Sequence, residues 1–225
     1  MAKQNPWLDV SIPLANGMHG WPGNPPTVIT MHLGTAKGDV CNVSAINFNS
    51  HTGTHMDAPL HFLPGTKTMD DLPWDAVIGP ARVVEIRDKE AIKPAELKKL
   101  KPRQGERLLF KTRNSAGSWK KKSFDKDFIY IAKEGAQYLV DCGVQTVGVD
   151  YFSVGGFYKD GIETHHVLLG ADVWIIEGLN FEHVKPGNYD LICLPIKFHQ
   201  GDGAPARCLI RADAANFPQR FVCTL

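Results

Sequence analysis

The chain is poor in the features that mark several large classes of protein. Only five of its 225 residues are cysteines, and no two lie close enough to indicate a zinc ribbon or a redox motif. We expect reduced core cysteines at Cys41, Cys142, Cys193, Cys208 and Cys223, with a catalytic thiol as the alternative. The sequence has no run of about 18 apolar residues that could span a bilayer, and its first ten residues lack the apolar stretch of a secretory signal. A cytoplasmic protein is therefore expected.

An excess of charge of one sign is also missing. The chain carries 25 lysines and arginines against 24 acidic residues, a formal net charge of +1, and both signs are spread along it. Such a balance argues against a nucleic-acid or membrane partner. One basic run, residues 120–122, is followed by Asp125 and Asp127, which favours a solvated loop over a phosphate site. A chain of this length fits one domain, residues 1–225, that buries on the order of 70% of its unfolded surface.

Strand patterns dominate the sequence, and no repeat or linker interrupts them. Apolar residues that alternate with polar ones, or form short apolar runs, predict strands at residues 8–14, 28–33, 40–48, 81–86, 107–112, 146–149, 172–176, 191–198 and 207–211. A short helix is expected over residues 94–101, because proline is tolerated in a first helical turn. The clearest helical pattern covers residues 129–142 and is followed by Gly143, a typical stop signal.

Residues 51–62, HTGTHMDAPLHF, concentrate side chains that bind metals. His51, His55, Asp57 and His61 follow one another at intervals of two or four residues. In an extended or turning segment these intervals bring side chains back to one face. Imidazole and carboxylate ligands together suit zinc, manganese or iron. The pattern predicts a divalent metal site on a loop or strand end, and a catalytic site must leave one coordination position open.

Two other interpretations of residues 51–62 compete with a catalytic metal site. A helical metalloprotease motif carries a glutamate directly after its first histidine, and Thr52 occupies that position, so this interpretation fails. The other is a structural metal, or a set of buried hydrogen-bonded histidines. Structural zinc sites usually recruit cysteine, and residues 51–62 contain none.

A second candidate ligand pair lies more than a hundred residues later. His165 and His166 precede an apolar strand that ends in Glu177. A charged glutamate directly after such a strand is costly unless it is paired or binds a metal, so Glu177 is either a ligand or the partner of an arginine such as Arg207. Adjacent histidines point in different directions on a regular backbone, so His165 and His166 are not expected to share one ion.

Together these motifs resemble the cyclase-like metal-dependent hydrolase family, whose members include kynurenine formamidases and isatin hydrolases. The resemblance rests on four segments: HTGTHMDAPLHF at residues 51–62, HHVLLGADVWIIEGLN from His165, LICLPIKFHQGDGAPAR from Leu191, and Trp21-Pro22-Gly23. It implies an α+β fold, a single β/β/α domain around a barrel-like, strand-rich core. It also implies homodimers or homotetramers, sometimes with a neighbouring chain near the pocket.

The resemblance further implies a role for each site residue. His51, His55 and Asp57 would hold one metal ion, and Asp57 would bridge to a second ion held by His165 and Glu177. His61 would be the catalytic acid/base, and Trp21 would line the substrate pocket. The cofactor would be one or two divalent ions, with zinc favoured over manganese by affinity order. A bound ion would activate water to cleave the C–N bond of a small-molecule amide.

Several positions stay open at this stage. Val154-Gly155-Gly156-Phe157 departs from the formamidase pattern, in which an acidic residue tends to follow the preceding serine, so this loop is expected to shape the pocket. The aromatic side chains nearby either wall the pocket or pack in the core; these are Tyr151, Phe152, Phe157 and Tyr158. Gly201 and Gly203 either permit a turn or bring backbone close to a ligand.

Three polar residues have uncertain places as well. His19 and His199 could approach the cleft, and Asp150 could orient a metal ligand or cap a turn. Three functions are therefore compared: an arylformamidase, a hydrolase of a cyclic amide such as isatin, and a metal-binding protein without catalysis.

Overall fold

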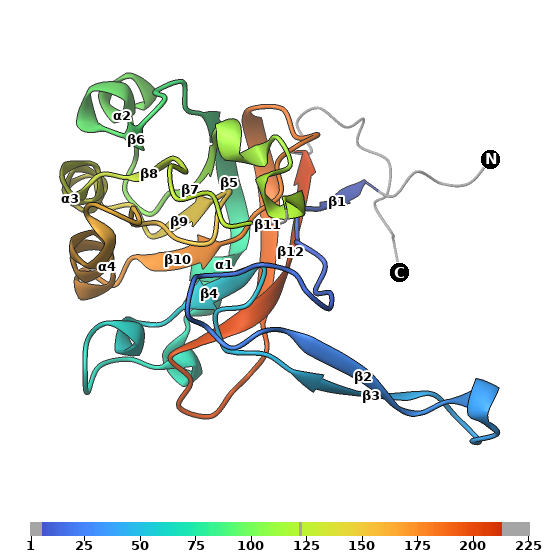
Figure 1. Cartoon of the computed structure of the whole chain (residues 1–225). Coiled ribbons are helices and arrows are strands. Elements are labelled where there is room, and N and C mark those ends of the chain that lie inside the picture. The colour runs from blue at the N-terminus through green and yellow to red at the C-terminus, as the bar shows by residue number, and fades with distance from the viewer. Residues whose placement is uncertain (1–5, 122, 213–225) are drawn as a thin grey trace, which may run out of the picture.

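The longest strands of the chain join into one sheet that closes on itself. A computed structural model describes residues 6–121 and 123–212, so Cys223 and Lys122 lie outside the described residues. The strands are β1 (Trp7–Asp9), β2 (Val28–Leu33), β3 (Val43–Asn47), β4 (His55–Asp57), β5 (Ile78–Glu85), β6 (Ala91–Ile92), β7 (Arg107–Lys111), β8 (Tyr130–Ile131), β9 (Thr146–Val149), β10 (Trp174–Glu177), β11 (Gly187–Pro195) and β12 (Gly203–Ala212). The α-helices are α1 (Trp74–Val77), α2 (Pro94–Leu100), α3 (Lys133–Asp141) and α4 (Gly161–Gly170) (Figure 1).

The main sheet runs β1-β12-β11-β5-β7-β9-β10-β4, and a further pairing of β12 with β4 closes it into a barrel. β5, β7, β9 and β10 pair in parallel, while the other neighbours are antiparallel. β1 lies outside the ring, on the free edge of β12. The α+β fold with a barrel-like core, expected from the sequence, is thus confirmed.

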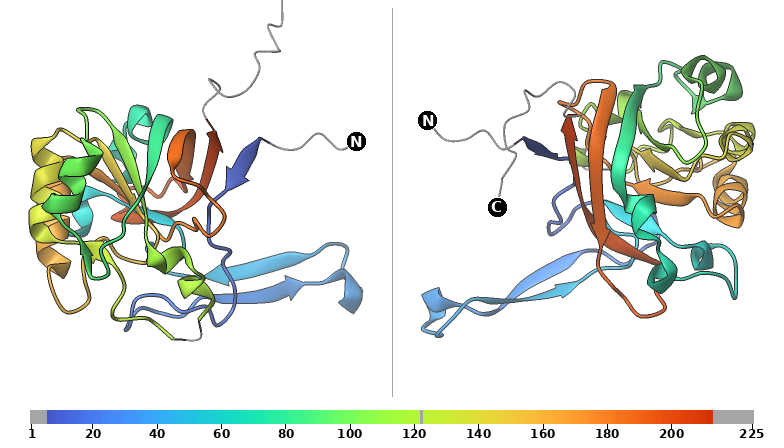
Figure 2. Two further views of the ribbon diagram at one scale, coloured as in Figure 1. Left: turned by 90° about the horizontal axis from the view of Figure 1, so that it is seen from above. Right: turned by 180° about the vertical axis from the view of Figure 1, so that it is seen from behind.

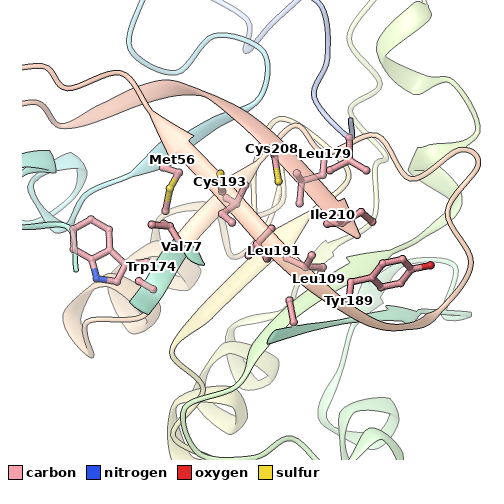
Figure 3. Packing of buried hydrophobic residues seen from close by; sticks show 14 of the residues in the cluster. Met56, Val77, Leu109, Trp174, Leu179, Tyr189, Leu191, Cys193, Cys208 and Ile210 are labelled. Carbon is pink, nitrogen blue, oxygen red and sulfur yellow. The ribbon is translucent and has the colours of Figure 1, made fainter. Parts of the chain in front are cut away.

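Three clusters of buried apolar residues form, and alternation along the strands of the main sheet divides their side chains between two of them. On β7, Leu109 belongs to the cluster inside the barrel, whereas Leu108 and Phe110 belong to the cluster under the helices. Met56, Leu191, Cys193 and Cys208 are among the inward residues and pack together in Figure 3. The second cluster includes Leu97 of α2, Leu139 of α3 and Leu168 of α4, so the three helices cover one outer face of the barrel (Figure 1).

A two-stranded arm projects from the barrel in every view (Figures 1 and 2). It consists of β2 and β3, which pair only with each other, and a short 3₁₀ turn at its tip, Thr35–Lys37. Val28, Met31, Val43 and Ile46 on this arm are all exposed. An isolated hairpin with exposed apolar side chains is only marginally stable in water.

Several sequence predictions match the structure closely. The expected strands at 28–33 and 146–149 match β2 and β9 residue for residue, and the expected helix at 94–101 corresponds to α2. The strand expected over 8–14 is wrong beyond Asp9, where a single bridge from Ser11 to Leu179 and then Pro13 follow. The helix expected from residue 129 begins only at Lys133, because Tyr130 and Ile131 form β8.

The cysteine prediction is only partly correct. Cys193 and Cys208 are buried opposite each other on β11 and β12, whereas Cys142 is half-buried and Cys41 is exposed. All four are free thiols. In the part of the chain that the structure describes, no helix has the length and apolarity needed to cross a bilayer.

Candidate metal centre

The candidate site is built on β4, the short strand that closes the barrel. All three of its residues are buried, and it pairs with β10 on one side and with β12 on the other. Met56 points into the barrel, so His55 and Asp57 face the opposite side. Glu177, at the end of β10, stands opposite His55 in the register and shares that side. The site therefore lies against the outside of the barrel wall, on a strand and the turns beside it.

His165 reaches this group from α4, a helix that the sequence analysis missed. His55 Nδ1 lies 2.9 Å from the Gly53 carbonyl oxygen, and His165 Nδ1 lies 2.6 Å from the Gly161 carbonyl oxygen. A carbonyl only accepts, so each Nδ1 carries a proton, and each Nε2 is the ring nitrogen left to face the carboxylates. These Nε2 atoms face Glu177, at 3.2 Å for His55 and 3.4 Å for His165. His166 is exposed, as expected for the neighbour of a buried histidine.

His51 and His61 complete the group from the loop before β4 and from a 3₁₀ turn, Pro59–His61. Their rings stack, with centroids 3.8 Å apart. His51 Nδ1 lies 2.9 Å from Asp57 Oδ1, and His51 Nε2 lies 2.9 Å from Asp202 Oδ2. The sequence predicts a turn around Asp202 but does not mark this carboxylate as a site residue. Its only local signal is an acidic residue between two glycines.

These residues fit a divalent cation. The ligand atoms of His51, Asp57 and His61 lie within 4.8 Å of one another, and so do those of His55, Asp57 and Glu177. Asp57 belongs to both sets. Its Oδ2 atom is buried without a hydrogen-bond partner among residues 6–121 and 123–212, and His165 Nε2 is 3.8 Å away. A buried, acceptor-only oxygen beside imidazole nitrogens is suited to a cation.

The charges of the site follow from these contacts. Burial alone would lower the pKa of His51, but its hydrogen bonds with Asp202 and Asp57 outweigh burial and raise that pKa to about 10. Burial would raise the pKa of Glu177, yet the hydrogen bonds from His165 and His55 bring it well below its usual range. Burial lowers the pKa of His61, which favours a neutral imidazole near pH 7.

A cleft of about 680 Å³ opens onto the candidate ligands. Trp21, the expected substrate-binding residue, lines it and lies with its ring centroid 5.3 Å from that of Phe157. Phe62, Phe152 and Tyr158 add further aromatic surface, and Gly156 brings the divergent loop to the cleft. Three charged residues at the cleft were not foreseen: Lys159, Asp160 and Glu163.

Other candidates have structural roles. Asp150 accepts hydrogen bonds from the Thr112 and Ser115 amides and hydroxyls, and so caps the 3₁₀ turn Arg113–Ser115. Tyr151 packs in the core, where its hydroxyl accepts a hydrogen bond from the Asp125 amide.

The remaining open residues also have partners outside the ligand group. Arg207 forms an ion pair with Asp9 and leaves Glu177 to the histidines. His199 is 85% exposed and pairs with Asp70. His19 contacts Phe152 edge-on, one residue removed from the cleft surface. Lys121 pairs with Asp125, which agrees with a solvated loop.

Known proteins are similar to this chain in sequence and in fold. The Cyclase family model matches residues 8–155. A kynurenine formamidase of Bacillus thuringiensis (strain Al Hakam) is 34% identical over 209 residues, which cover 93% of this chain and 99% of that protein. A kynurenine formamidase of Geobacillus thermodenitrificans is 36% identical over 208 residues, which cover 92% and 98%.

Two solved structures extend the likeness to three dimensions. One is described as a potential metal-dependent hydrolase with cyclase activity; it superposes with a TM-score of 0.79 at 32% identity and covers 91% of this chain and 96% of its own. Isatin hydrolase A from Labrenzia aggregata has a TM-score of 0.79 at 19% identity, covers 92% and 93%, and shares the fold. From the family match, the full-length relatives and the closed barrel, we conclude that the chain belongs to the Cyclase family.

Proposed function

We propose that this chain is a metal-dependent hydrolase that cleaves the C–N bond of a small amide. The observation that carries the proposal is Asp57, a fully buried carboxylate shared by two sets of candidate ligands, with one oxygen that lacks a hydrogen-bond partner among the described residues. The ligands proposed for the two ions are His51, His55 and Asp57 for one and Asp57, His165 and Glu177 for the other. Zinc is proposed first and manganese second, by affinity order.

Besides the metal, the proposed reaction needs a residue that transfers a proton and side chains that orient the substrate. A divalent ion, when bound, lowers the pKa of water from 15.7 toward about 7 and polarises a carbonyl. His61 is 28% exposed at the cleft, and its lowered pKa lets a ring nitrogen accept a proton near pH 7 and pass it to the leaving nitrogen. Trp21 and Phe157 offer apolar walls that orient a flat substrate.

The substrate that we propose is an aryl formamide of the N-formylkynurenine type. Support comes from the kynurenine formamidases that match nearly the whole chain and from the aromatic walls of the cleft. The second candidate is a cyclic amide such as isatin. It is favoured by the loop from Val154 to Phe157, which lacks the acidic residue typical of formamidases and contributes Gly156 and Phe157 to the cleft.

Hydrolysis of N-formylkynurenine by zinc- or manganese-reconstituted protein tests the proposal, with isatin as the parallel substrate and chelated protein as background. Metal-dependent turnover of the formamide supports the first candidate. Turnover of isatin alone favours the second. Bound metal without turnover of either compound contradicts both and leaves a metal-binding protein without catalysis.

We also propose that the protein acts as a homodimer or homotetramer in the cytoplasm. The projecting β2–β3 arm supports association, because a second copy would cover its exposed Met31 and Ile46. The free cysteines suit a reducing compartment. Light scattering of the wild type and of Met31→Lys/Ile46→Lys tests the arm; a monomeric wild type contradicts the proposal.

A further inference from the structure

We propose that Asp202 is the positioning residue for His51, and that it holds the Nε2 proton of this ligand so that Nδ1 is presented to the metal. The inference rests on the proposed function only in requiring that the site binds a metal. It assigns a role to a carboxylate outside the ligand set that the sequence motifs imply.

The geometry places Asp202 behind the His51 ring. His51 Nε2 lies 2.9 Å from Asp202 Oδ2, while His51 Nδ1 faces Asp57 Oδ1 at the same distance on the other side. Among the described residues, both candidate ligand sets contain Asp57 and neither contains Asp202. Asp202 therefore touches a proposed ligand without belonging to the group that would surround the ion.

The other two buried histidines follow the same plan. His55 and His165 each place one ring nitrogen on a backbone carbonyl oxygen, that of Gly53 or Gly161, and turn the other toward the carboxylates. Metal-binding histidines usually donate their second N–H in this way, which fixes the tautomer and the ring orientation. For His51 the acceptor is the Asp202 side chain, and a carboxylate accepts more strongly than a carbonyl.

The turn that carries Asp202 is fastened on several sides. Its carbonyl oxygen accepts from the Ala58 amide at 2.9 Å, and the Gly201 carbonyl accepts from the Met69 amide at 2.9 Å. The Ser50 hydroxyl lies 3.3 Å from Asp202 Oδ2. These bonds place the carboxylate without help from the metal.

Gly203 completes the arrangement, because it lets the His51 ring lie directly against the backbone. A Cβ atom at Gly203 would stand 2.5 Å from His51 Cε1 and 3.1 Å from His51 Nδ1. Gly203 thus has a packing reason. Of the two interpretations left open by the sequence, turn and close approach, the second applies to Gly203.

Zinc affinity, measured by competition with a chromophoric chelator, tests the inference in wild type, Asp202→Ala and Asp202→Asn. We expect Asp202→Ala to bind the same number of ions with affinity reduced about 10- to 100-fold, as is typical when the hydrogen-bond partner of a ligand is lost. Asp202→Asn retains a carbonyl that can accept the Nε2 proton, so it should recover part of this loss. The visible spectrum of bound cobalt should shift in Asp202→Ala, because the ligand field changes.

The control is Asp190→Asn, which replaces a half-buried aspartate on β11, the strand before the turn that carries Asp202; Asp190 pairs with Arg211. This variant should bind zinc like the wild type. Wild-type affinity in both Asp202 variants overturns the inference, and so does loss of a whole ion equivalent, which would make Asp202 a direct ligand. A wild-type protein that binds no zinc would overturn the proposed function as well, so the two failures are distinguishable.

Discussion

The candidate ligands fall into two groups that differ in what holds them. His55, His165 and Glu177 stand on β4, α4 and β10 and are at most 5% exposed. His51 and His61 stand on loops at the cleft and are 14% and 28% exposed. Strands and backbone carbonyls fix the buried group, whereas the cleft group depends on the side chain of Asp202. Elements of regular structure thus position the deeper ligands, and side chains carried by loops face the cleft.

Asp57 joins the two groups, so its loss should have the largest effect. Asp57→Asn keeps the shape of the side chain but removes the charge and one acceptor oxygen. We expect the variant to lose both proposed metal ions. Turnover should fall by more than the ~10²- to 10⁴-fold typical of a lost proton-transfer residue. Metal analysis and amide hydrolysis measure both.

Asp150→Asn is the matched control for this variant, because Asp150 is also a buried carboxylate but caps a turn away from the ligands. It should lower the free energy of unfolding by about 1–3 kcal/mol, since donors lose their partner, yet retain the metal. Equal metal loss in both variants would mean that any buried carboxylate matters, and that Asp57 has no special place.

His61→Ala tests whether this residue of the cleft group transfers protons or binds metal. If His61 transfers protons and the other residues hold the metal, this variant keeps its full metal content and loses turnover about 10²- to 10⁴-fold. His199→Ala, which removes a surface histidine paired with Asp70, should retain both. Because His61 also lies in one candidate ligand set, loss of metal in His61→Ala would instead identify it as a ligand.

The smallest effect expected is the pH dependence of the cleft group. In the metal-free protein the pKa of His51 is about 10, above its ordinary value of 6.5. Its contribution to stability is therefore fully present below pH 6.5 and is lost as the pH rises through 10. The melting temperature of chelated protein should fall over that range.

Metal binding must also displace the His51 proton. Apparent zinc affinity should rise by about tenfold per pH unit between pH 7 and pH 9, because one proton leaves for each ion bound at His51. Competition titrations at fixed free zinc measure this slope. A flat profile would show that His51 is unprotonated before the metal arrives.

The ligands that could be predicted from the sequence are those with a signal in their own neighbouring residues. The segment from His51 to His61 concentrates metal-binding residues, and Glu177 is conspicuous as a charge directly after an apolar strand. Asp202 could not be predicted in this way. Its contact with His51 joins positions 151 residues apart, and no rule of sequence spacing describes such a contact. Helix α4 was also missed, since Thr164 and His165 are buried polar residues and hide the helical repeat completed by Leu168 and Leu169.

The arm illustrates a different limit. The alternation in residues 28–33 correctly predicts a strand, and the same alternation normally implies one face toward a core. Here the strand pairs only with β3 and leaves Met31 and Ile46 exposed. The alternation predicts the strand, but it does not predict whether the apolar side chains of the strand pack against the barrel.

The pairing of β4 with two later strands sets the order in which the barrel can close during synthesis. Both partners of this strand, residues 175–177 and 203–205, follow it by more than a hundred residues. During synthesis the ring stays open until β12 has left the ribosome, so β4 is translated early but gains its second partner last. Barrel closure therefore waits for residues 203–205, and a truncated chain that stops before β12 would leave β4 paired on one side only.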